Sequence, residues 1–442
     1  MKETLLREVF TSWLGKELPQ LVRRDYEFEL ADTVTALIGP RRAGKTFFMY
    51  QIASDLLSRG YEKSNIAYID FEDIRLATLE PSDYPAFVKV LHEVFTERKG
   101  KIVLFLDEVQ SLPGWERWVR TLHNSNKYYI FVSGSSSKLL GREVATQLRG
   151  RYVAQVILPF SFKEFLRCRR FKADILSSED RGRVLGFLDE YLRFGGFPEV
   201  VKEESENRKL ELLKSYVETV FYRDVVDRFR VRDVASLEVF MKILFQNMGK
   251  LLSISKVHNY FRSLGVRKSK KTLSNYLKYF ETSLYVFTVE KFGYKTRNRV
   301  KQPRKLYPID TGLYWLHPRF SKDIGILMET RVAIELYRRA LQDPMVEVYY
   351  WRDYQQHEVD FLVRRGLEVE SLIQVTYVRG FDEVDRRELR ALVKASDLLK
   401  CRELSVITWD YEDTSHCQGR SIKFIPLWKW LLRRGSEPKH KL

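Results

Sequence analysis

The sequence predicts an α/β protein that is built on a parallel sheet and carries further helical and α/β regions towards its C-terminus. One observation is a loop bounded by glycines, residues 39–46, which separates an apolar run at 34–38 from an apolar-periodic stretch at 47–57. Another is the run of five apolar residues at 102–106, which is typical of a strand buried on both faces of a parallel sheet. The third is the length of 442 residues, which exceeds one hydrophobic core, so we expect two or three domains.

Composition excludes several classes of protein. Hydrophobic residues make up 44% of the chain and aromatic residues 14%, which argues against a disordered protein. No run approaches ~20 uncharged apolar residues, and the N-terminus lacks the apolar core of a signal peptide, so we expect no membrane span. Cys168, Cys401 and Cys417 show no C-x-x-C spacing, which fits a reducing cytoplasm. The net charge of +17 should attract polyanions, although ordinary solvated lysines and arginines give the same count.

The loop has the spacing G-x4-G-K-T and the strand–loop–helix context of a phosphate-binding loop. Its glycines let the backbone N–H groups point at one anion, and the following helix adds the positive end of its dipole. Lys45 can reach terminal phosphates, and Thr46 can place its hydroxyl on Mg²⁺. A plain strand-to-helix turn is the alternative. The predicted nucleotide-binding residues are Gly39, Pro40, Arg41, Arg42, Ala43, Gly44, Lys45 and Thr46.

Acidic residues follow two predicted strands. The strand at 66–71 ends in Asp70, and the run at 102–106 leads into Asp107 and Glu108. A carboxylate at the end of a buried strand suits Mg²⁺, so we expect Asp107 to hold the metal together with Thr46. Glu108 is then placed to polarise the water that attacks the γ-phosphate. A solvated strand end is the alternative. The sequence shows no guanine-binding signature, so ATP is the expected nucleotide.

A further buried strand, residues 128–132, ends in a run of serines. Ser133 and Ser135 are both placed to touch the γ-phosphate or the attacking water, and the sequence does not decide between them. Guanidinium groups downstream are able to neutralise charge in a transition state, although each is equally well a solvated surface arginine. These arginines are Arg142, Arg149 and Arg151.

The segments GPRRAGKT, LFLDEVQ, VSGSSS, LRGRY and YLRFGGFPEVV together resemble a family of archaeal and bacterial AAA-like ATPases with a C-terminal domain of uncharacterised role. The resemblance covers roughly residues 20–430. It implies a parallel sheet with strand order 5-1-4-3-2 and a small helical lid at about 159–204. It also implies a winged-helix region in the middle of the chain.

The pattern from residue 233 to 315 is three helices followed by a two-stranded ribbon, as in a winged helix-turn-helix. The third helix, about 269–280, is where a groove-reading helix would lie, and Ser253 is a plausible N-cap of the second. Basic residues concentrate on the third helix and on the loop of the ribbon, which favours DNA binding over a protein-interaction module. The predicted DNA-binding residues are Lys268, Lys270, Lys271, Asn275, Lys278, Arg297 and Arg299.

From residue 328 the order is helix, strand, strand ending in an acid, turn and strand, which resembles the core of restriction-endonuclease-like nucleases. Such nucleases hold Mg²⁺ with an Asp on one strand and Glu-x-Lys on the next. Asp360 fits the first position, and Glu329 is a possible helix acid. Gln374 and Thr376 stand where the Glu and the Lys belong, and neither supplies the required charge. The sequence therefore favours a nuclease-like fold without activity over an active nuclease.

The chain is thus expected to comprise four segments. They are a P-loop ATPase core at 1–158, a helical lid and linker at 159–232, a winged helix-turn-helix at 233–315, and an endonuclease-like α/β domain at 316–442. The favoured function is an Mg²⁺-dependent ATPase that drives conformational change in attached DNA-binding or interaction domains. A DNA-binding regulator with negligible turnover and a protein-binding signalling switch are alternatives. The expected partners are ATP, Mg²⁺, double-stranded DNA, and a protein partner or a second copy of the chain, without a membrane.

Overall fold

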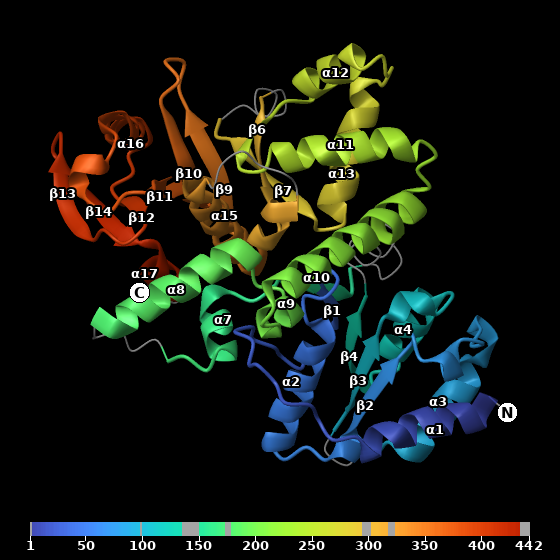
Figure 1. The fold of residues 1–442 in the computed structure, drawn as a ribbon. Helices are drawn as coiled ribbons and strands as arrows, with labels where there is room; N and C mark the ends of the chain where they lie inside the picture. Colours follow the sequence, from blue (N-terminus) through green and yellow to red (C-terminus); the bar gives the residue numbers. More distant parts are fainter. Residues whose placement is uncertain are drawn as a thin grey trace. The chain divides into compact units, whose positions relative to one another are not determined.

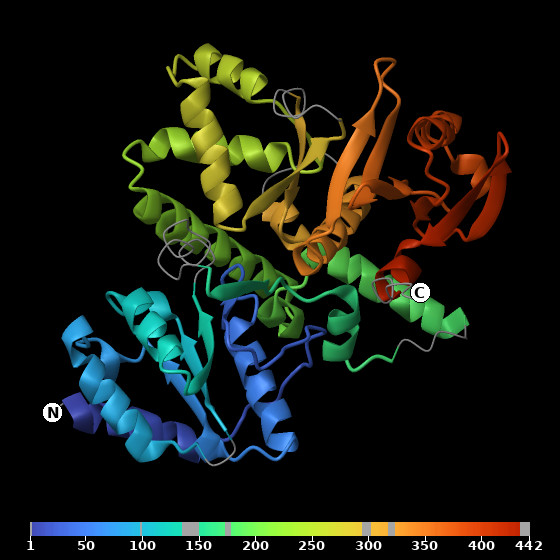
Figure 2. The same cartoon turned by 180° about the vertical axis from the view of Figure 1, so that it is seen from behind.

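The computed structural model describes residues 2–97, 100–134, 150–172, 178–293, 302–316 and 323–433. The chain divides into two compact units, an N-terminal unit (Met1–Leu158) and a C-terminal unit (Pro159–Leu442). Figures 1 and 2 show their elements from opposite sides. Among the residues that the structure describes, no helix is both long and apolar enough to cross a membrane.

The N-terminal unit contains a five-stranded parallel sheet with strand order β2-β3-β4-β1-β5. Read from the other edge, this is the order 5-1-4-3-2, so the expected sheet is confirmed. All six residues of β3 are buried, as the apolar run predicts for a central parallel strand. The strands are β1 (Val34–Ile38), β2 (Ile66–Asp70), β3 (Ile102–Asp107), β4 (Tyr128–Ser133) and β5 (Tyr152–Val156).

Helices and short 3₁₀ turns surround this sheet (Figure 1). Helices α1 and α3 lie side by side in both views, with the rings of Phe10 and Phe87 packed edge to face at 5.5 Å. The α-helices are α1 (Lys2–Gly15), α2 (Lys45–Ser58), α3 (Tyr84–Val94) and α4 (Trp115–Asn124). The 3₁₀ turns are Lys63–Asn65, Ile74–Leu76, Pro81–Asp83 and Val109–Ser111.

The C-terminal unit begins with helices where the lid is expected. Ser161 and Glu164 form a capping box that starts the first of them. The helices are α7 (Phe162–Cys168), α8 (Ser178–Phe194), α9 (Pro198–Lys202) and α10 (Glu206–Thr219), which continues into a π-helix (Val220–Asp227).

The next segment has the expected order of helices and ribbon. The Ser253 hydroxyl accepts a hydrogen bond from the Lys256 N–H, so its predicted capping role is confirmed. Strands β7 and β8 pair antiparallel, and β6 pairs with β8. The elements are α11 (Val234–Gln246), β6 (Lys250–Leu252), α12 (Ile254–Ser263), α13 (Lys270–Thr282), β7 (Val286–Lys291) and β8 (Arg304–Pro308).

The remaining strands join this ribbon in one mixed nine-stranded sheet, with order β13-β14-β12-β11-β10-β9-β7-β8-β6. The link is a parallel pairing of β7 with β9, in which Glu290 lies opposite Tyr349. The boundary expected near residue 315 therefore falls between strands of a single sheet, because β9 supplies partners for the edge of β7. The strands are β9 (Val346–Arg352), β10 (Glu358–Arg365), β11 (Glu368–Val375), β12 (Leu404–Thr408), β13 (Asp413–Cys417) and β14 (Arg420–Pro426). The helical elements are a 3₁₀ turn (Thr311–Leu316), α15 (Ile324–Gln342), a 3₁₀ turn (Phe381–Glu383), α16 (Arg386–Leu399) and α17 (Leu427–Leu432).

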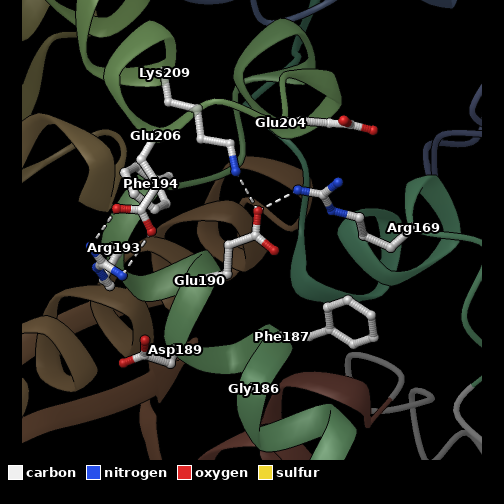
Figure 3. A pocket seen from close by; sticks show the side chains of 10 residues that line it. All are labelled: Arg169, Gly186, Phe187, Asp189, Glu190, Arg193, Phe194, Glu204, Glu206 and Lys209. Atoms are coloured by element: carbon white, nitrogen blue, oxygen red, sulfur yellow. Dashed lines mark hydrogen bonds and ion pairs between the residues drawn. The ribbon is translucent and has the colours of Figure 1, made fainter.

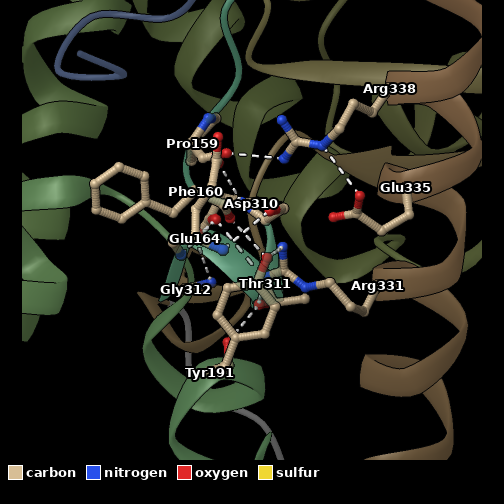
Figure 4. A network of polar contacts seen from close by, with 12 residues as sticks. Pro159, Phe160, Glu164, Tyr191, Asp310, Thr311, Gly312, Arg331, Glu335 and Arg338 are labelled. Atoms are coloured by element: carbon tan, nitrogen blue, oxygen red, sulfur yellow. Dashed lines mark hydrogen bonds and ion pairs between the residues drawn. The ribbon is translucent and has the colours of Figure 1, made fainter. Parts of the chain in front are cut away.

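A buried polar network joins α8, the turn after β8 and α15 (Figure 4). The fully buried Arg331 donates to the hydroxyl of Tyr191 at 2.8 Å and to that of Thr311, and its guanidinium lies 3.8 Å from the centre of the Tyr191 ring. Asp310, also fully buried, lies 3.6 Å from Arg331 and accepts a hydrogen bond from the Gly196 N–H at 2.8 Å.

This network explains the first glycine in YLRFGGFP. Gly195 has φ +78°, and a Cβ on it would lie 1.5 Å from Oδ1 of Asp310, so the close approach requires glycine. The helices after residue 159 are therefore tied to α15 and its sheet within one unit.

Candidate functional site

The loop between β1 and α2 contains two glycines that are required for different reasons. A Cβ on Gly39 would lie 2.1 Å from the carbonyl oxygen of Ile157, so the backbone approach leaves no room for a side chain. Gly44 precedes α2 with φ 94°, a left-handed conformation that favours glycine. The loop therefore has the tight curl that a phosphate-binding loop requires.

Lys45 opens α2 and is buried. Its Nζ donates to the carbonyl oxygens of Gly39 and Pro40, each at 3.2 Å, so the ammonium lies at the loop itself. The first turn of this 14-residue helix carries no acid. An ammonium and a helix N-terminus at one glycine loop suit a phosphate anion.

Asp107, at the end of β3, is the centre of a hydrogen-bond cluster. It is only 2% exposed, and its Oδ2 accepts from the Thr46 hydroxyl and from the Tyr68 hydroxyl, each at 2.7 Å. Its Oδ1 accepts from the Ser133 hydroxyl. The structure thus brings together Thr46 and Asp107, the two residues predicted to hold the metal.

This donor set fits Mg²⁺ bound together with a nucleotide. A carboxylate and a hydroxyl oxygen are ligands that Mg²⁺ accepts, and the ion usually keeps several waters and phosphate oxygens. Within the described part of the chain, no group of three or more His, Cys, Asp or Glu side chains is arranged to hold a metal ion. The geometry therefore suits a metal that arrives with phosphates better than a metal cage made of protein side chains.

Glu108 adopts an unusual backbone conformation directly after Asp107. Its φ is 47°, in the left-handed region, which costs a residue other than glycine roughly 1–3 kcal/mol. Its N–H donates to the Ser133 hydroxyl at 3.1 Å, and its carboxylate accepts from the Gln110 side-chain amide. The turn, Ser133 and Gln110 together orient the Glu108 side chain.

Two residues of β2, Tyr68 and Asp70, lie beside Asp107. Asp70 pairs in register with Asp107, and burial, with added repulsion from Asp107 and Glu108, raises the pKa of Asp70. Burial and the charge of Asp107 likewise raise the pKa of Tyr68, so its phenol stays a hydrogen-bond donor. The sequence reasoning missed Tyr68. The available signal was period-2 alternation, which places Tyr68 on the same face of the strand as Asp70.

Of the predicted arginines, the structure describes Arg151, which it does not bring to the loop. Arg151 directly precedes β5, where its carbonyl accepts from the N–H of Val34 at 2.9 Å and its guanidinium donates to Asn124 at 2.6 Å. Val34 is at the amino end of β1, whereas the loop follows the carboxyl end, about 16 Å along the strand. Arg149 lies outside the described residues, as do Arg142 and Ser135.

The exposed face of α13 carries most of the predicted DNA-binding residues that the structure describes, namely Lys270, Lys271, Asn275 and Lys278. Lys268 is different because it pairs with Asp233, and this ion pair lowers the pKa of Asp233 to about 2. Arg297 and Arg299 lie outside the described residues.

The nuclease-like residues meet in the C-terminal sheet. The Asp360 N–H donates to the Gln374 side chain at 3.3 Å, and Asp360 Oδ2 accepts from the Val375 N–H at 2.9 Å. Thr376 instead hydrogen-bonds Glu388, a residue whose pKa burial raises to about 7.

A lysine that the sequence reasoning missed lies among these acids. Lys305 Nζ, on β8, lies 2.8 Å from Asp360 Oδ1, 2.9 Å from Glu329 Oε1 and 3.0 Å from Glu358 Oε1. Burial disfavours this ammonium, but the three carboxylates raise the pKa of Lys305 well above its usual value. Burial also raises the pKa of Glu329, which accepts from the Tyr307 hydroxyl at 2.6 Å.

An open pocket of about 420 Å³ lies between α8, α10 and the end of α7 (Figure 3). Its side chains largely neutralise one another, since Glu190 accepts from Lys209 at 2.6 Å and also from Arg169. None of the predicted site residues lines it.

Three segments of the chain match known protein-family models. Residues 31–166 match an AAA domain, and residues 186–322 and 324–430 match two domains of unknown function (DUF8612 and DUF4143). The AAA match contains the loop, Asp107 and Glu108, and it suggests ATP binding. The AAA part of the expected resemblance is thereby confirmed.

Two solved structures resemble this chain distantly. The ORC2 protein of Aeropyrum pernix shares 12% identity, with 77% of this chain and 94% of that chain covered and a TM-score of 0.37. Cdc6p from Pyrobaculum aerophilum shares 13%, with 75% and 93% covered and a TM-score of 0.26. At these TM-scores the likeness carries no argument.

Two curated relatives match over most of their length. An uncharacterized protein of Haemophilus influenzae is 28% identical, covering 92% of this chain and 96% of its own. An uncharacterized protein of Methanocaldococcus jannaschii is 35% identical, covering 98% of this chain and 96% of its own. The chain therefore belongs to the family of this Methanocaldococcus jannaschii protein, with an AAA domain followed by two domains of unknown function.

Proposed function

We propose that the chain is an Mg²⁺-dependent ATPase whose nucleotide site lies at residues 39–46. The observation that carries this proposal is the contact of Thr46 Oγ1 with Asp107 Oδ2 at 2.7 Å, directly beside the glycine loop. A hydroxyl and a carboxylate that converge at a phosphate-binding loop are the pair that holds Mg²⁺ in P-loop nucleotidases. The AAA-domain match over the same residues supports the assignment.

Each residue then has a defined task. The loop N–H groups and Lys45 neutralise the phosphates, and Thr46 and Asp107 hold the metal. When bound, Mg²⁺ reduces the charge on the phosphate oxygens. Glu108 accepts a proton from the attacking water. Ser133 keeps Asp107 and the Glu108 backbone in place through its two hydrogen bonds.

The junction between the units supports coupling of the nucleotide site to the rest of the chain. Leu158 is held in the N-terminal unit, where its N–H donates to the Tyr26 hydroxyl at 3.0 Å and its carbonyl accepts from Arg24. Pro159 is held in the C-terminal unit, where its carbonyl accepts from Arg338 at 2.8 Å. We therefore propose that nucleotide turnover acts on the C-terminal unit as one body.

The nucleotide site is tested with Lys45→Ala. This variant should bind ATP at least 10-fold more weakly, because the loop loses its buried ammonium, a charge-assisted contact of roughly 1.5–3 kcal/mol. Binding of a fluorescent ATP analogue in Mg²⁺ measures the change. Lys127→Ala is the matched control, since Lys127 is 52% exposed and its nearest carboxylate lies 3.7 Å away. Equal affinity of Lys45→Ala and the parent would exclude this loop as the nucleotide site.

A second candidate function is the binding of double-stranded DNA through α13. The observation that favours it is the exposed face formed by Lys270, Lys271, Asn275 and Lys278, opposite a buried face. The element order α11–β6–α12–α13–β7–β8 is that of a winged helix, in which this helix reads the groove. Lys268 is not part of the proposed contact, because Asp233 already binds it.

This candidate is tested with the double variant Lys270→Ala/Lys271→Ala. We expect weaker duplex binding, with the slope of log affinity against log salt reduced by about 2, because each lost phosphate contact removes about 0.9. Fluorescence anisotropy measures the duplex affinity at salt concentrations from about 50 to 200 mM, and the slope follows from these values. The control is Lys423→Ala/Lys429→Ala, which removes two partly exposed lysines elsewhere. An unchanged slope would show that α13 does not contact the phosphates.

A further inference from the structure

The carboxylate of Asp107 is held by three hydroxyl donors that differ in origin. Thr46 belongs to the loop, and Ser133 ends the strand next to β3. Thr46 meets the nucleotide in the proposed reaction, whereas Ser133 is fully buried and also accepts a hydrogen bond from the Glu108 N–H. Tyr68, the third donor, comes from the middle of β2 and reaches Oδ2 at 2.7 Å.

The Tyr68 ring is fixed by its surroundings. It is 8% exposed, and its centre lies 5.2 Å from the Trp13 ring and 5.0 Å from the Tyr50 ring. Trp13 is fixed in turn, because its indole N–H donates to the carbonyl of Ile66 at 2.6 Å. The Tyr50 hydroxyl accepts from Lys16 Nζ at 3.0 Å. The Tyr68 hydroxyl therefore approaches Asp107 from a rigid aromatic cluster anchored on α1.

We infer that Tyr68 is a positioning residue for the Mg²⁺–nucleotide site, acting through Asp107. This inference rests on the proposed function. A carboxylate only accepts hydrogen bonds, so its rotamer is set by its donors. Of the two donors to Oδ2, Thr46 lies at the nucleotide loop, and only Tyr68 comes from the core. It holds Oδ2 in one orientation whether or not the nucleotide is present, so the metal meets a preorganised carboxylate.

An ordinary core tyrosine would pack in the same way without affecting the metal. The two roles differ in what the hydroxyl contributes, and Tyr68→Phe removes this oxygen while it keeps the ring. Removal of an outer-shell partner typically weakens metal affinity about 10–100-fold. We expect the Mg²⁺ concentration for half-maximal nucleotide binding to be at least 10-fold higher for Tyr68→Phe than for the parent. Without Mg²⁺, the two proteins should bind the nucleotide with equal affinity.

The experiment titrates Mg²⁺ into full-length protein with a fluorescent ATP analogue and follows binding, so it does not depend on turnover. Tyr128→Phe is the matched control, because it removes a buried phenol oxygen from the same sheet that pairs with His92 at 2.8 Å rather than with Asp107 or Tyr68. Its Mg²⁺ requirement should stay within about twofold of the parent, well below the change expected for an outer-shell partner. Tyr68→Phe in an Asp107→Asn background should add no further change, since the partner through which Tyr68 acts is altered.

The outcomes separate the inference from the proposed function. If the parent shows no Mg²⁺-dependent nucleotide binding, the proposed function fails. If the parent shows it and folded Tyr68→Phe has the same Mg²⁺ requirement, Tyr68 is a core residue only and the inference is overturned. Thermal melting establishes that the variant is folded. Tyr68→Leu, which also lacks a donor, replaces it in the same titration if the phenylalanine variant does not fold.

Discussion

ATP turnover is expected to fall about 100- to 10,000-fold when Glu108 is replaced by glutamine, the range that a general base contributes. Glutamine has nearly the same shape, so the left-handed turn at φ 47° and the hydrogen bond from its N–H to Ser133 should persist. The amide cannot take a proton from the attacking water. ATP binding should therefore be retained while phosphate release is lost, and both are measurable on one protein preparation.

The matched control is Glu72→Gln. Glu72 follows the neighbouring strand β2 and is exposed, so it carries the same charge without being oriented by Ser133 and Gln110. Removal of the Glu72 charge should leave ATP turnover within about twofold of the parent, as expected of a surface substitution away from the site. If Glu108→Gln hydrolyses ATP like the parent, Glu108 is not the base, and the reaction uses another group.

Lys305→Met is expected to lower the free energy of unfolding of the C-terminal unit by about 3–5 kcal/mol, the usual cost of breaking a buried ion pair from one side. The ammonium lies within 3.0 Å of oxygens from Glu329, Glu358 and Asp360. Methionine fills a similar volume but leaves these carboxylates without their cation. Denaturant unfolding followed by tryptophan fluorescence measures the loss.

The loss should depend on pH. The pKa of Glu329 is already raised by burial, and removal of Lys305 takes away the charge that opposes the shift. A carboxyl group with a folded pKa above its unfolded value stabilises the fold at low pH and loses that contribution as pH rises through the folded pKa. The loss of unfolding free energy in Lys305→Met should therefore be smaller at about pH 5 than at about pH 8, two values that lie on either side of the raised pKa.

The control for this prediction is Lys423→Met, which breaks an exposed pair with Glu403 and should cost about 0–1 kcal/mol. Equal stability of Lys305→Met and the parent at both pH values would show that the acids do not need the lysine. In the structure, the Lys305 ammonium lies beside Asp360 and Glu329, the two acids that the sequence analysis compares with a nuclease metal site.

Local patterns are sufficient to predict the loop at 39–46 and the acid that ends β3. Each signal lies within one short segment: the G-x4-G-K-T spacing marks the loop, and the apolar run marks the strand before Asp107. A parallel sheet brings the carboxyl ends of its strands to one edge, which explains why Asp107 lies beside Thr46 and Ser133. The strand order required the family resemblance, since periodicity does not determine which strands are neighbours.

Contacts between distant segments were not predictable in the same way. Tyr68 looks like a core residue until the pairing of β2 with β3 brings Asp107 beside its strand. Lys305 lies 55 residues before Asp360, and in the sequence alone it is one more basic residue of a ribbon. Its role depends on the pairing of β7 with β9, which merges two segments that the sequence separates.

The most direct test of the account is the amount of phosphate released per chain from excess ATP in the presence of Mg²⁺. The proposed ATPase predicts that wild-type protein releases many phosphates per chain and that omission of Mg²⁺ abolishes the release. Release that never exceeds one phosphate per chain, with tight ATP binding intact, would contradict it. That result would instead identify the chain as an ATP-binding regulator without turnover.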